Sequence, residues 1–332
     1  MSFSGHLNLY TSSNFCCMKE VKPYLVTIAL FTTTFFTTTL AGVQWMNRDP
    51  IELSNFHYGL PFSLSILFIL AAHEFGHYIA ARLYQVDVTL PFFIPFPPFP
   101  IVESVPFLFN PFGTMGAVIR MRSPLQSKKM LFDIGIAGPL AGLAATAGVL
   151  FYGFLTLPTI DYLYQIHPEF VKHPTTGEGF AFGNSALFFA LSKFFAQNAF
   201  VPPMTEIYHY PYLCAGWFGL FVTALNLIPV GQLDGGHIIY ALVGSRAQSA
   251  IAWTFFVLLI IVGLLGFLPL VIPGANWGSI GWLIWAAILY FIIKLRHPIV
   301  SDDEGLSPAR TILGWLTIAL FFFIFPPIPF YE

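Results

Sequence analysis

Charged residues are scarce in this chain. Only 9% of its 332 residues are Asp, Glu, Lys or Arg, whereas a soluble domain carries about 25%. Cysteine is also scarce: Cys16 and Cys17 are adjacent and Cys214 stands alone, which excludes a disulfide framework and zinc-finger spacing. No basic run indicates a nucleic-acid partner. The composition therefore excludes an ordinary soluble domain and gives no support to nucleic-acid binding.

Apolar residues dominate the chain instead. Hydrophobic residues make up 56% of it and aromatic residues 18%, and the mean hydropathy is +0.73. Apolar runs close to the ~20 residues that cross a bilayer recur along the sequence. We therefore expect an all-α polytopic membrane protein with about six or seven transmembrane helices. The predicted spans are residues 24–45, 60–85, 131–155, 212–230, 250–272, 277–293 and 311–325.

One membrane domain, residues 24–330, is expected after a polar tail, residues 1–23. Its first apolar run lacks a convincing cleavage site, so we interpret it as a retained span. Prolines recur through residues 86–130 and rule out a continuous helix there. Residues 113–122 alternate in the manner of a strand. A small re-entrant β segment is therefore expected between the second and third spans, and a long outer loop at residues 156–211.

The Lys and Arg residues are distributed unevenly among the connections between the predicted spans. With seven spans and a cytoplasmic N-terminus, eleven Lys and Arg residues fall inside and three outside. This asymmetry predicts that the N-terminus lies in the cytoplasm. The inside set is Lys19, Lys22, Arg82, Arg120, Arg122, Lys128, Lys129, Arg246, Lys294, Arg296 and Arg310, and the outside set is Arg48, Lys172 and Lys193.

Three ionisable residues lie inside the second predicted span, where such side chains are costly. They belong to the pattern H-E-x-x-H at residues 73–77. On a helix, His73 and His77 lie one turn apart on the same face and can hold one Zn²⁺. Glu74 then lies beside the open position of the metal and can move a proton from water to a leaving amine. We expect a zinc site inside the membrane, nearer the cytoplasmic face.

Asp234 is the preferred third ligand, because a catalytic zinc usually has three protein ligands. It follows Pro229, which should end the fourth span, and precedes two glycines that are expected to allow tight turns. The second and fourth spans run in the same direction, so His73 and Asp234 reach a similar depth. Two alternatives stay open: Asp234 caps the next helix, or His237 competes for the ligand position.

Small residues recur in the third predicted span, at Gly135, Gly138 and Gly142. Small residues three or four positions apart let helices approach closely in a membrane. We therefore expect a packing role for these glycines and no chemical one.

The paired motifs resemble the site-2 protease family of intramembrane zinc metalloproteases. The residues that carry the resemblance are A-H-E-F-G-H at 72–77, G-P-L-A-G at 138–142 and N-L-I-P-V-G-Q-L-D-G at 226–235. The resemblance extends from residue 60 to residue 244. It implies one zinc per chain, held by His73, His77 and Asp234, with Glu74 as the general base. It also implies that Asn226 stabilises the tetrahedral intermediate or holds the substrate.

The activity implied by the resemblance is hydrolysis of a peptide bond in or near a transmembrane segment of a membrane-protein substrate. The strand at residues 113–122 would then either pair with an unwound substrate or serve only as a structural hairpin. The overall plan is similar to the subgroup found in bacteria and plastids, so a bacterial cytoplasmic membrane is expected.

Two alternatives to a protease are a membrane zinc-binding or transport protein and a catalytically silent relative that binds substrates. A transporter is expected to place polar residues along several spans, whereas here they gather at one depth. The intact Glu74 argues against a silent relative.

Overall fold

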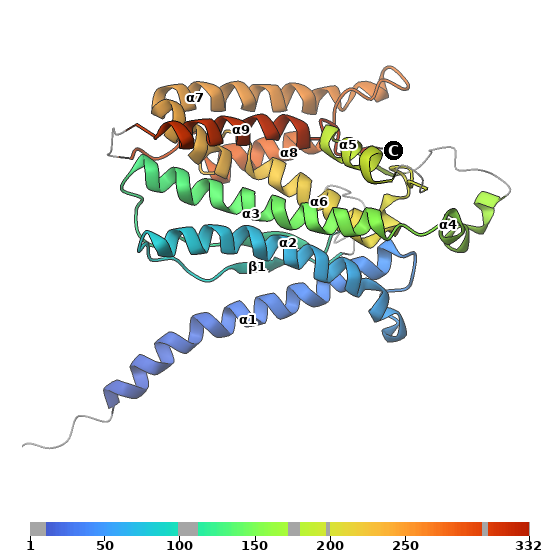
Figure 1. Ribbon diagram of the computed structural model, residues 1–332, viewed down its shortest axis with the longest axis horizontal. Helices are drawn as coiled ribbons and strands as arrows, with labels where there is room; N and C mark the ends of the chain where they lie inside the picture. Colours follow the sequence, from blue (N-terminus) through green and yellow to red (C-terminus); the bar gives the residue numbers. More distant parts are fainter. Residues whose placement is uncertain (1–10, 99–111, 172–179, 197–199, 301–304, 332) are drawn as a thin grey trace, which may run out of the picture.

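The computed structural model describes residues 11–98, 112–171, 180–196, 200–300 and 305–331. These residues form a bundle in which most helices run roughly along one direction (Figure 1). The helices are α1 (Thr11–Trp45), α2 (Phe56–Leu83), α3 (Lys128–Leu155), α4 (Ile160–Ile166), α5 (Ala186–Phe195), α6 (Pro211–Asn226), α7 (Asp234–Leu265), α8 (Gly281–Ile288) and α9 (Pro308–Ile324). The strands are β1 (Phe92–Pro95), β2 (Thr114–Val118), β3 (Ala181–Phe182) and β4 (Phe330–Tyr331).

Four helical segments in the described residues are long and apolar enough to cross a membrane. They are Tyr24–Trp45, Leu53–Leu83, Lys128–Leu155 and Asp234–Leu270. Three shorter apolar helices accompany them, at Ala186–Phe195, Gly281–Ile293 and Pro308–Ile324. The chain is therefore a mostly helical integral membrane protein, as its composition predicts.

Several boundaries differ from the prediction, among them those of α7, α6 and α1. The span predicted at residues 250–272 belongs to α7, which begins at Asp234 and is interrupted at Gly244, where φ is 79°. Helix α6 ends at Asn226, before residue 230, because Pro229 lacks the N–H that would continue the helix. Helix α1 begins at Thr11, inside the stretch predicted as a polar tail. The first ten residues of that tail lie outside the described residues.

Threonine hydroxyls of α1 donate hydrogen bonds to carbonyls of the same helix. Thr33 and Thr34 donate to the carbonyls four residues earlier at 2.8 Å, and Thr39 does so at 2.7 Å. These bonds satisfy the polar groups of a membrane helix internally. Thr38 Oγ1 also lies 2.7 Å from Ser63 Oγ, which links α1 to α2.

The connection between α2 and α3 contains the expected β segment. Strands β1 and β2 pair antiparallel, with Phe93 opposite Ala117. Thr37 Oγ1 donates to the Gly113 carbonyl at 2.6 Å and so attaches this hairpin to α1. The prediction of a strand at residues 113–122 is confirmed over β2. Residues 99–111, the middle of the predicted re-entrant segment, lie outside the described residues.

The predicted outer loop contains secondary structure of its own. It holds α4, the 3-10 turn Pro168–Val171, strand β3 and α5, and β3 pairs with β4 near the end of the chain. Ser185 accepts a hydrogen bond from the Phe188 N–H and so caps α5. Phe189 and Phe194 on α5 are exposed. Helix α5 therefore presents these two phenylalanines on the outside of the bundle.

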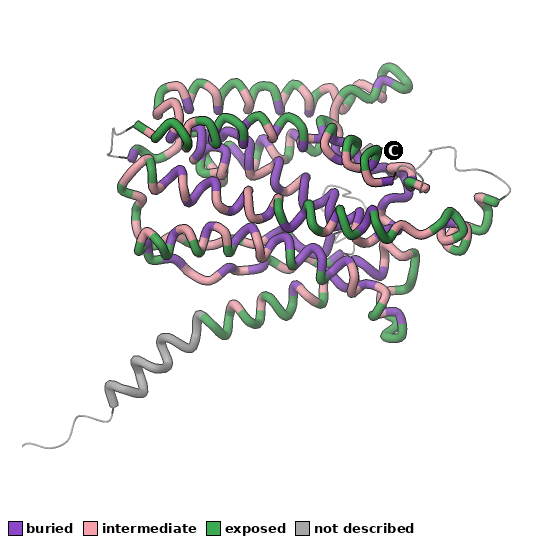
Figure 2. Tube along the Cα trace, in the orientation of Figure 1, coloured by how far each residue is buried: buried purple, intermediate pink, exposed green. Residues whose placement is uncertain are grey.

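Helix α6 lies in the interior of the bundle. Buried residues concentrate in the central helices, and exposed residues face outward along α7 and α9 (Figure 2). Trp217 and Leu213 of α6 are each 1% exposed, and Trp217 Nε1 donates to the Gly183 carbonyl at 2.7 Å. An enclosed α6 holds its last residue, Asn226, at a fixed position relative to α2 and α3.

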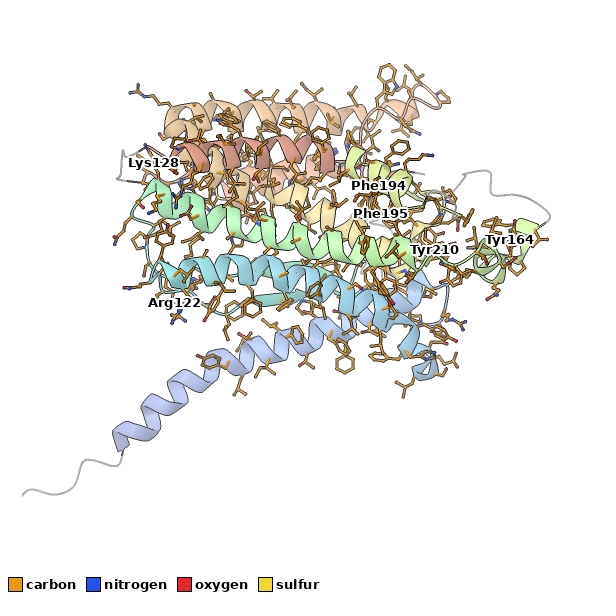
Figure 3. The ribbon with its side chains drawn as sticks, viewed as in Figure 1. Arg122, Lys128, Tyr164, Phe194, Phe195 and Tyr210 are labelled. Atoms are coloured by element: carbon orange, nitrogen blue, oxygen red, sulfur yellow. The ribbon has the colours of Figure 1, made fainter. Side chains whose placement is uncertain are left out.

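The two ends of the bundle differ in character. Arg122 and Lys128 lie at one end, and Tyr164 and Tyr210 lie at the other (Figure 3). At the basic end, the Arg310 guanidinium donates twice to Asp133, at 2.8 Å each, and so joins α9 to α3. Arg122, Lys128 and Arg310, which all belong to the predicted inside set, thus lie at the same end of the bundle.

Candidate active site

Helix α2 carries the H-E-x-x-H residues on a face turned into the bundle. His73, Glu74 and His77 are only 4%, 7% and 7% exposed. Helix α3 packs along α2, α6 lies against both of these helices, and α7 lies against α3. Three ionisable groups buried at such a depth require partners, because unpaired charge is costly away from water.

The partner is Asp234, at the start of α7. Its Oδ2 lies 3.2 Å from His73 Nε2, and its Oδ1 lies 3.3 Å from His77 Nε2. The two Nε2 atoms are 3.2 Å apart. A tetrahedral zinc with bonds of about 2.0–2.1 Å would hold its ligand atoms about 3.3 Å apart. Two imidazole nitrogens and one carboxylate at these separations therefore fit a zinc ion.

The tautomer of His77 also suits a metal ligand. Its Nδ1 lies 2.7 Å from the Ile134 carbonyl, and a carbonyl can only accept a hydrogen bond. The proton is thus on Nδ1, which leaves the lone pair of Nε2 facing His73 and Asp234. Metal-binding histidines are commonly oriented by such a bond.

Asp234 is not the capping residue of α7. The N-cap position belongs to Leu233, whose apolar side chain makes no capping hydrogen bond. Asp234 is the first helical residue. A carboxylate in the first turn is favoured by the helix dipole, and here it faces the two imidazoles. The structure thus brings together the three residues that the sequence predicts as ligands.

The glycines after Asp234 do not form turns. Gly235 and Gly236 lie within α7, and Gly231 is the residue of this segment with a positive φ, 56°. A Cβ on Gly235 would lie 2.0 Å from the Leu227 carbonyl oxygen. The expected tight turn is therefore wrong at these two positions: their small size lets the chain after α6 pass close to the start of α7.

His237 lies one turn beyond Asp234 and pairs with a different residue. Its Nδ1 is 2.7 Å from His297 Nε2, and His297 Nδ1 is 2.6 Å from the Pro298 carbonyl. Since that carbonyl can only accept, neutral imidazoles require His237 Nδ1 to donate to His297. His237 lines the pocket but is not part of the group formed by His73, His77 and Asp234.

Asn226 ends α6 beside the histidines. Its Nδ2 lies 3.2 Å from His73 Nε2. The amide therefore faces the same small volume as the ligand atoms, although it stands 153 positions from His73 in the sequence.

The glycines of α3 make room for the histidines. A Cβ on Gly138 would lie 2.0 Å from His77 Nε2, and one on Gly142 would lie 3.0 Å from His73 Cβ. The predicted close packing of α3 is confirmed, since a Cβ on Gly76 of α2 would lie 2.5 Å from the Ala137 carbonyl oxygen. The sequence analysis did not predict that imidazole rings occupy the space beside these glycines. Gly138 and Gly142 are four residues apart, as are His73 and His77, and this equal spacing could have indicated the contact.

A pocket of about 200 Å³ opens beside Glu74. Ala117 and Val118 of β2 and Ile119, just after it, line this pocket together with Glu74. The hairpin therefore forms one wall of the pocket, as a substrate-pairing edge would require. The lining residues are His73, Glu74, His77, Ala117, Val118, Ile119, Met121, Leu125, Leu131, Ile134, Gly135, Asn226, Gln232, Leu233, Asp234 and His237.

Comparison with known proteins identifies the family of this chain. Residues 61–268 match the model of Peptidase family M50. The chain is 30% identical over 82% of its length to "Probable zinc metalloprotease EGY1, chloroplastic" of Oryza sativa subsp. japonica, of which 41% is covered. It is 30% identical over 72% of its length to the protein of that name from Arabidopsis thaliana, of which 37% is covered.

A third relative is "Probable zinc metalloprotease EGY2, chloroplastic" of Arabidopsis thaliana, 26% identical over 89% of this chain and 47% of that protein. The chain thus spans less than half the length of these curated relatives. The family match includes both H-E-x-x-H and Asp234. The chain therefore belongs to peptidase family M50, the site-2 protease family that its paired motifs resemble.

Proposed function

We propose that this chain is an intramembrane zinc endopeptidase that hydrolyses a peptide bond in or near a transmembrane segment of a membrane-protein substrate. The observation that carries the proposal is the approach of Asp234 on α7 to His73 and His77 on α2, at 3.2 and 3.3 Å. The relatives' names, each beginning "Probable zinc metalloprotease", support the peptidase part of this proposal. A buried group of this composition is expected to be functional.

His73, His77 and Asp234 would hold one zinc through two Nε2 atoms and the carboxylate. Bound zinc supplies Lewis acidity, which polarises the scissile carbonyl and makes a water molecule more acidic. The Ile134 carbonyl keeps the His77 lone pair directed at the cluster. Gly138 and Gly142 leave both imidazoles in place.

Glu74 acts as the general base. A carboxylate oxygen takes the proton of the attacking water and delivers it to the nitrogen of the leaving amine. Glu74 lines the pocket beside Ile119 and the two histidines, so its carboxylate is within the volume where water and substrate would meet. Asn226 Nδ2 would donate to the substrate oxygen as negative charge develops there.

The hairpin would hold the substrate. A helical substrate hides its carbonyls in its own hydrogen bonds, so the cleaved segment must be extended. Strand β2 pairs with β1 in a two-stranded sheet, and Ala117 and Val118 line the pocket. An extended substrate added along β2 would reach Glu74. The position of these residues in the pocket wall favours substrate contact over a purely structural hairpin.

Six or seven spans are proposed for the full domain, with the N-terminus in the cytoplasm. The short apolar helices Gly281–Ile293 and Pro308–Ile324 would add to the four longer ones, and buried α6 would cross within the bundle. A bacterial cytoplasmic membrane is the proposed location. The chloroplast names of the relatives make a plastid membrane the alternative.

Zinc content tests the ligand set. Purified wild-type chain and the Asp234→Ala variant are compared by inductively coupled plasma mass spectrometry. The variant is expected to lose about one zinc per chain, because three ligands define one site and two imidazoles alone hold zinc weakly. Asp161→Ala, in α4, serves as a control and should keep its zinc. Undiminished zinc in Asp234→Ala would remove Asp234 from the ligand set.

Cysteine labelling tests the orientation. In a chain with its three native cysteines replaced by alanine, Lys129→Cys and Gln165→Cys introduce one exposed thiol at each end of the bundle. A membrane-impermeant maleimide added to intact cells should label position 165 and spare position 129 until the membrane is opened. Labelling in the opposite order would reverse the orientation.

A further inference from the structure

A second cluster of His and Glu side chains lies at the other end of α6. It consists of His167, at the end of α4, and Glu206 and His209, just before α6. Asn226, which contacts His73 of the first cluster, ends this 16-residue helix, so a helix of about 24 Å, at ~1.5 Å per residue, lies between the two clusters. Figure 1 shows α4 at the end of the bundle remote from the start of α3.

The three ligand atoms of this cluster face one another. His167 Nε2 and His209 Nε2 are 2.9 Å apart. Glu206 Oε2 lies 3.6 Å from the first and 3.7 Å from the second. Glu206 and His209 are 5% and 2% exposed. Two imidazole nitrogens and a carboxylate oxygen thus meet in a largely buried volume, with separations that span the ~3.3 Å expected around a tetrahedral metal.

The outward nitrogens of both imidazoles are already engaged as donors. His209 Nδ1 lies 2.6 Å from the Trp45 carbonyl, and His167 Nδ1 lies 3.0 Å from the Glu169 carboxylate. Carbonyls and carboxylates accept hydrogen bonds, so each Nδ1 carries a proton. In neutral imidazoles both Nε2 atoms then present lone pairs to each other at 2.9 Å. Metal-binding histidines show this same outer arrangement.

Glu206 adds a third acceptor and no donor. Its Oε2 is buried and has no hydrogen-bond partner within the part of the chain that the structure describes. At 3.6 and 3.7 Å the carboxylate is too far from the imidazoles for a hydrogen bond. Two imidazole nitrogens and a buried carboxylate oxygen without a partner thus face a common point, where a bound cation would satisfy all three.

We propose that His167, Glu206 and His209 form a second metal site, which binds a divalent transition-metal ion such as Zn²⁺. Imidazole nitrogen with one carboxylate is a donor set that zinc accepts. The site would bring the count to two metals per chain, one more than the H-E-x-x-H motif predicts. It would join the end of α4 to the start of α6 and, through the Trp45 carbonyl, to the end of α1.

The test isolates this cluster from the proposed catalytic one. The full chain carrying His73→Ala and Asp234→Ala is exposed to Zn²⁺, separated from unbound metal by gel filtration and analysed by mass spectrometry. About one zinc per chain should remain, and X-ray absorption should show imidazole nitrogens at about 2.0–2.1 Å from it. Added Zn²⁺ should also raise the melting temperature of this variant.

Adding His167→Ala to that variant should remove both the zinc and the shift in melting temperature. His57→Ala, which removes an exposed histidine of α2, is the matched control and should change neither. In an otherwise wild-type chain, His167→Ala should keep one zinc, at the first cluster, so failure of either site is detected separately. The proposal is overturned if the folded His73→Ala/Asp234→Ala variant binds no zinc, or if its zinc survives His167→Ala.

Discussion

Glu74→Gln is expected to abolish cleavage while leaving the protein folded and loaded with zinc. Glutamine has nearly the same size as glutamate but cannot accept a proton and return it at neutral pH. General acid–base catalysis contributes at least ~10²-fold, so the rate of product formation should fall by that factor or more. The measurement compares new protein termini, by mass spectrometry, in membranes containing wild type or the variant, with zinc content determined on the same preparations.

The control for this substitution is Glu52→Gln, which makes the same chemical change at an exposed position and should cleave normally. Retained substrate in the Glu74→Gln variant, as a trapped complex, would further support the assignment. A near-normal cleavage rate would contradict the role of Glu74 even if the zinc site were correct. A transport protein would instead show altered zinc flux, with no cleavage product missing from the variant.

Gly138→Ala is expected to lose zinc and cleavage together. The added Cβ would lie 2.0 Å from His77 Nε2 and 2.4 Å from both Cδ2 and Cε1, so the ring must rotate or α3 must move away from α2. Either change breaks the hydrogen bond to the Ile134 carbonyl. Loss of a bond that orients a metal ligand already costs about 10–100-fold in affinity, so displacement of His77 itself should cost at least ~100-fold. Zinc titration and the cleavage assay measure the two effects.

Gly148→Ala is the matched control, because it makes the same change in the same helix where nothing lies within 4 Å of the added Cβ. It should keep normal zinc affinity and cleavage, and alanine is favoured over glycine in a helix by about 1 kcal/mol. Gly138→Ala should still elute as a folded protein with unchanged helix content. If it also binds zinc as tightly as wild type, the glycine does not shape the site.

The local features of the site could be predicted from short stretches of sequence. The spacing of His73 and His77 places both rings on one face whenever those residues are helical, and the apolar flanks make the helix a membrane span. The threonines of α1 hydrogen-bond to the carbonyls of their own helix, because the acceptor lies only four residues away. Such predictions depend on contacts within one turn of helix.

Other features could not be predicted, because they depend on residues from separate elements. The second cluster joins His167 to His209, 42 positions later, and no motif marks it. The pairing of β3 with β4 joins residues 181–182 to residues 330–331. Both are decided by how the segment after α3 folds back on the bundle, which the local pattern of apolar and polar residues does not specify.

By itself, the sequence determined that the chain is a mostly helical membrane protein with an H-E-x-x-H helix, since composition and the period of a helix suffice for both. It also indicated Asp234 as the partner of the two histidines, because the second and fourth predicted spans run in the same direction and so bring these residues to a similar depth. Only the tertiary structure decided that Asp234 begins α7 with its carboxylate 3.2 and 3.3 Å from the two imidazoles, and that Gly138 leaves space for His77. The physical reason is packing: distances of this kind depend on how closely α2, α3 and α7 approach, and that approach depends on side chains from all three helices at once.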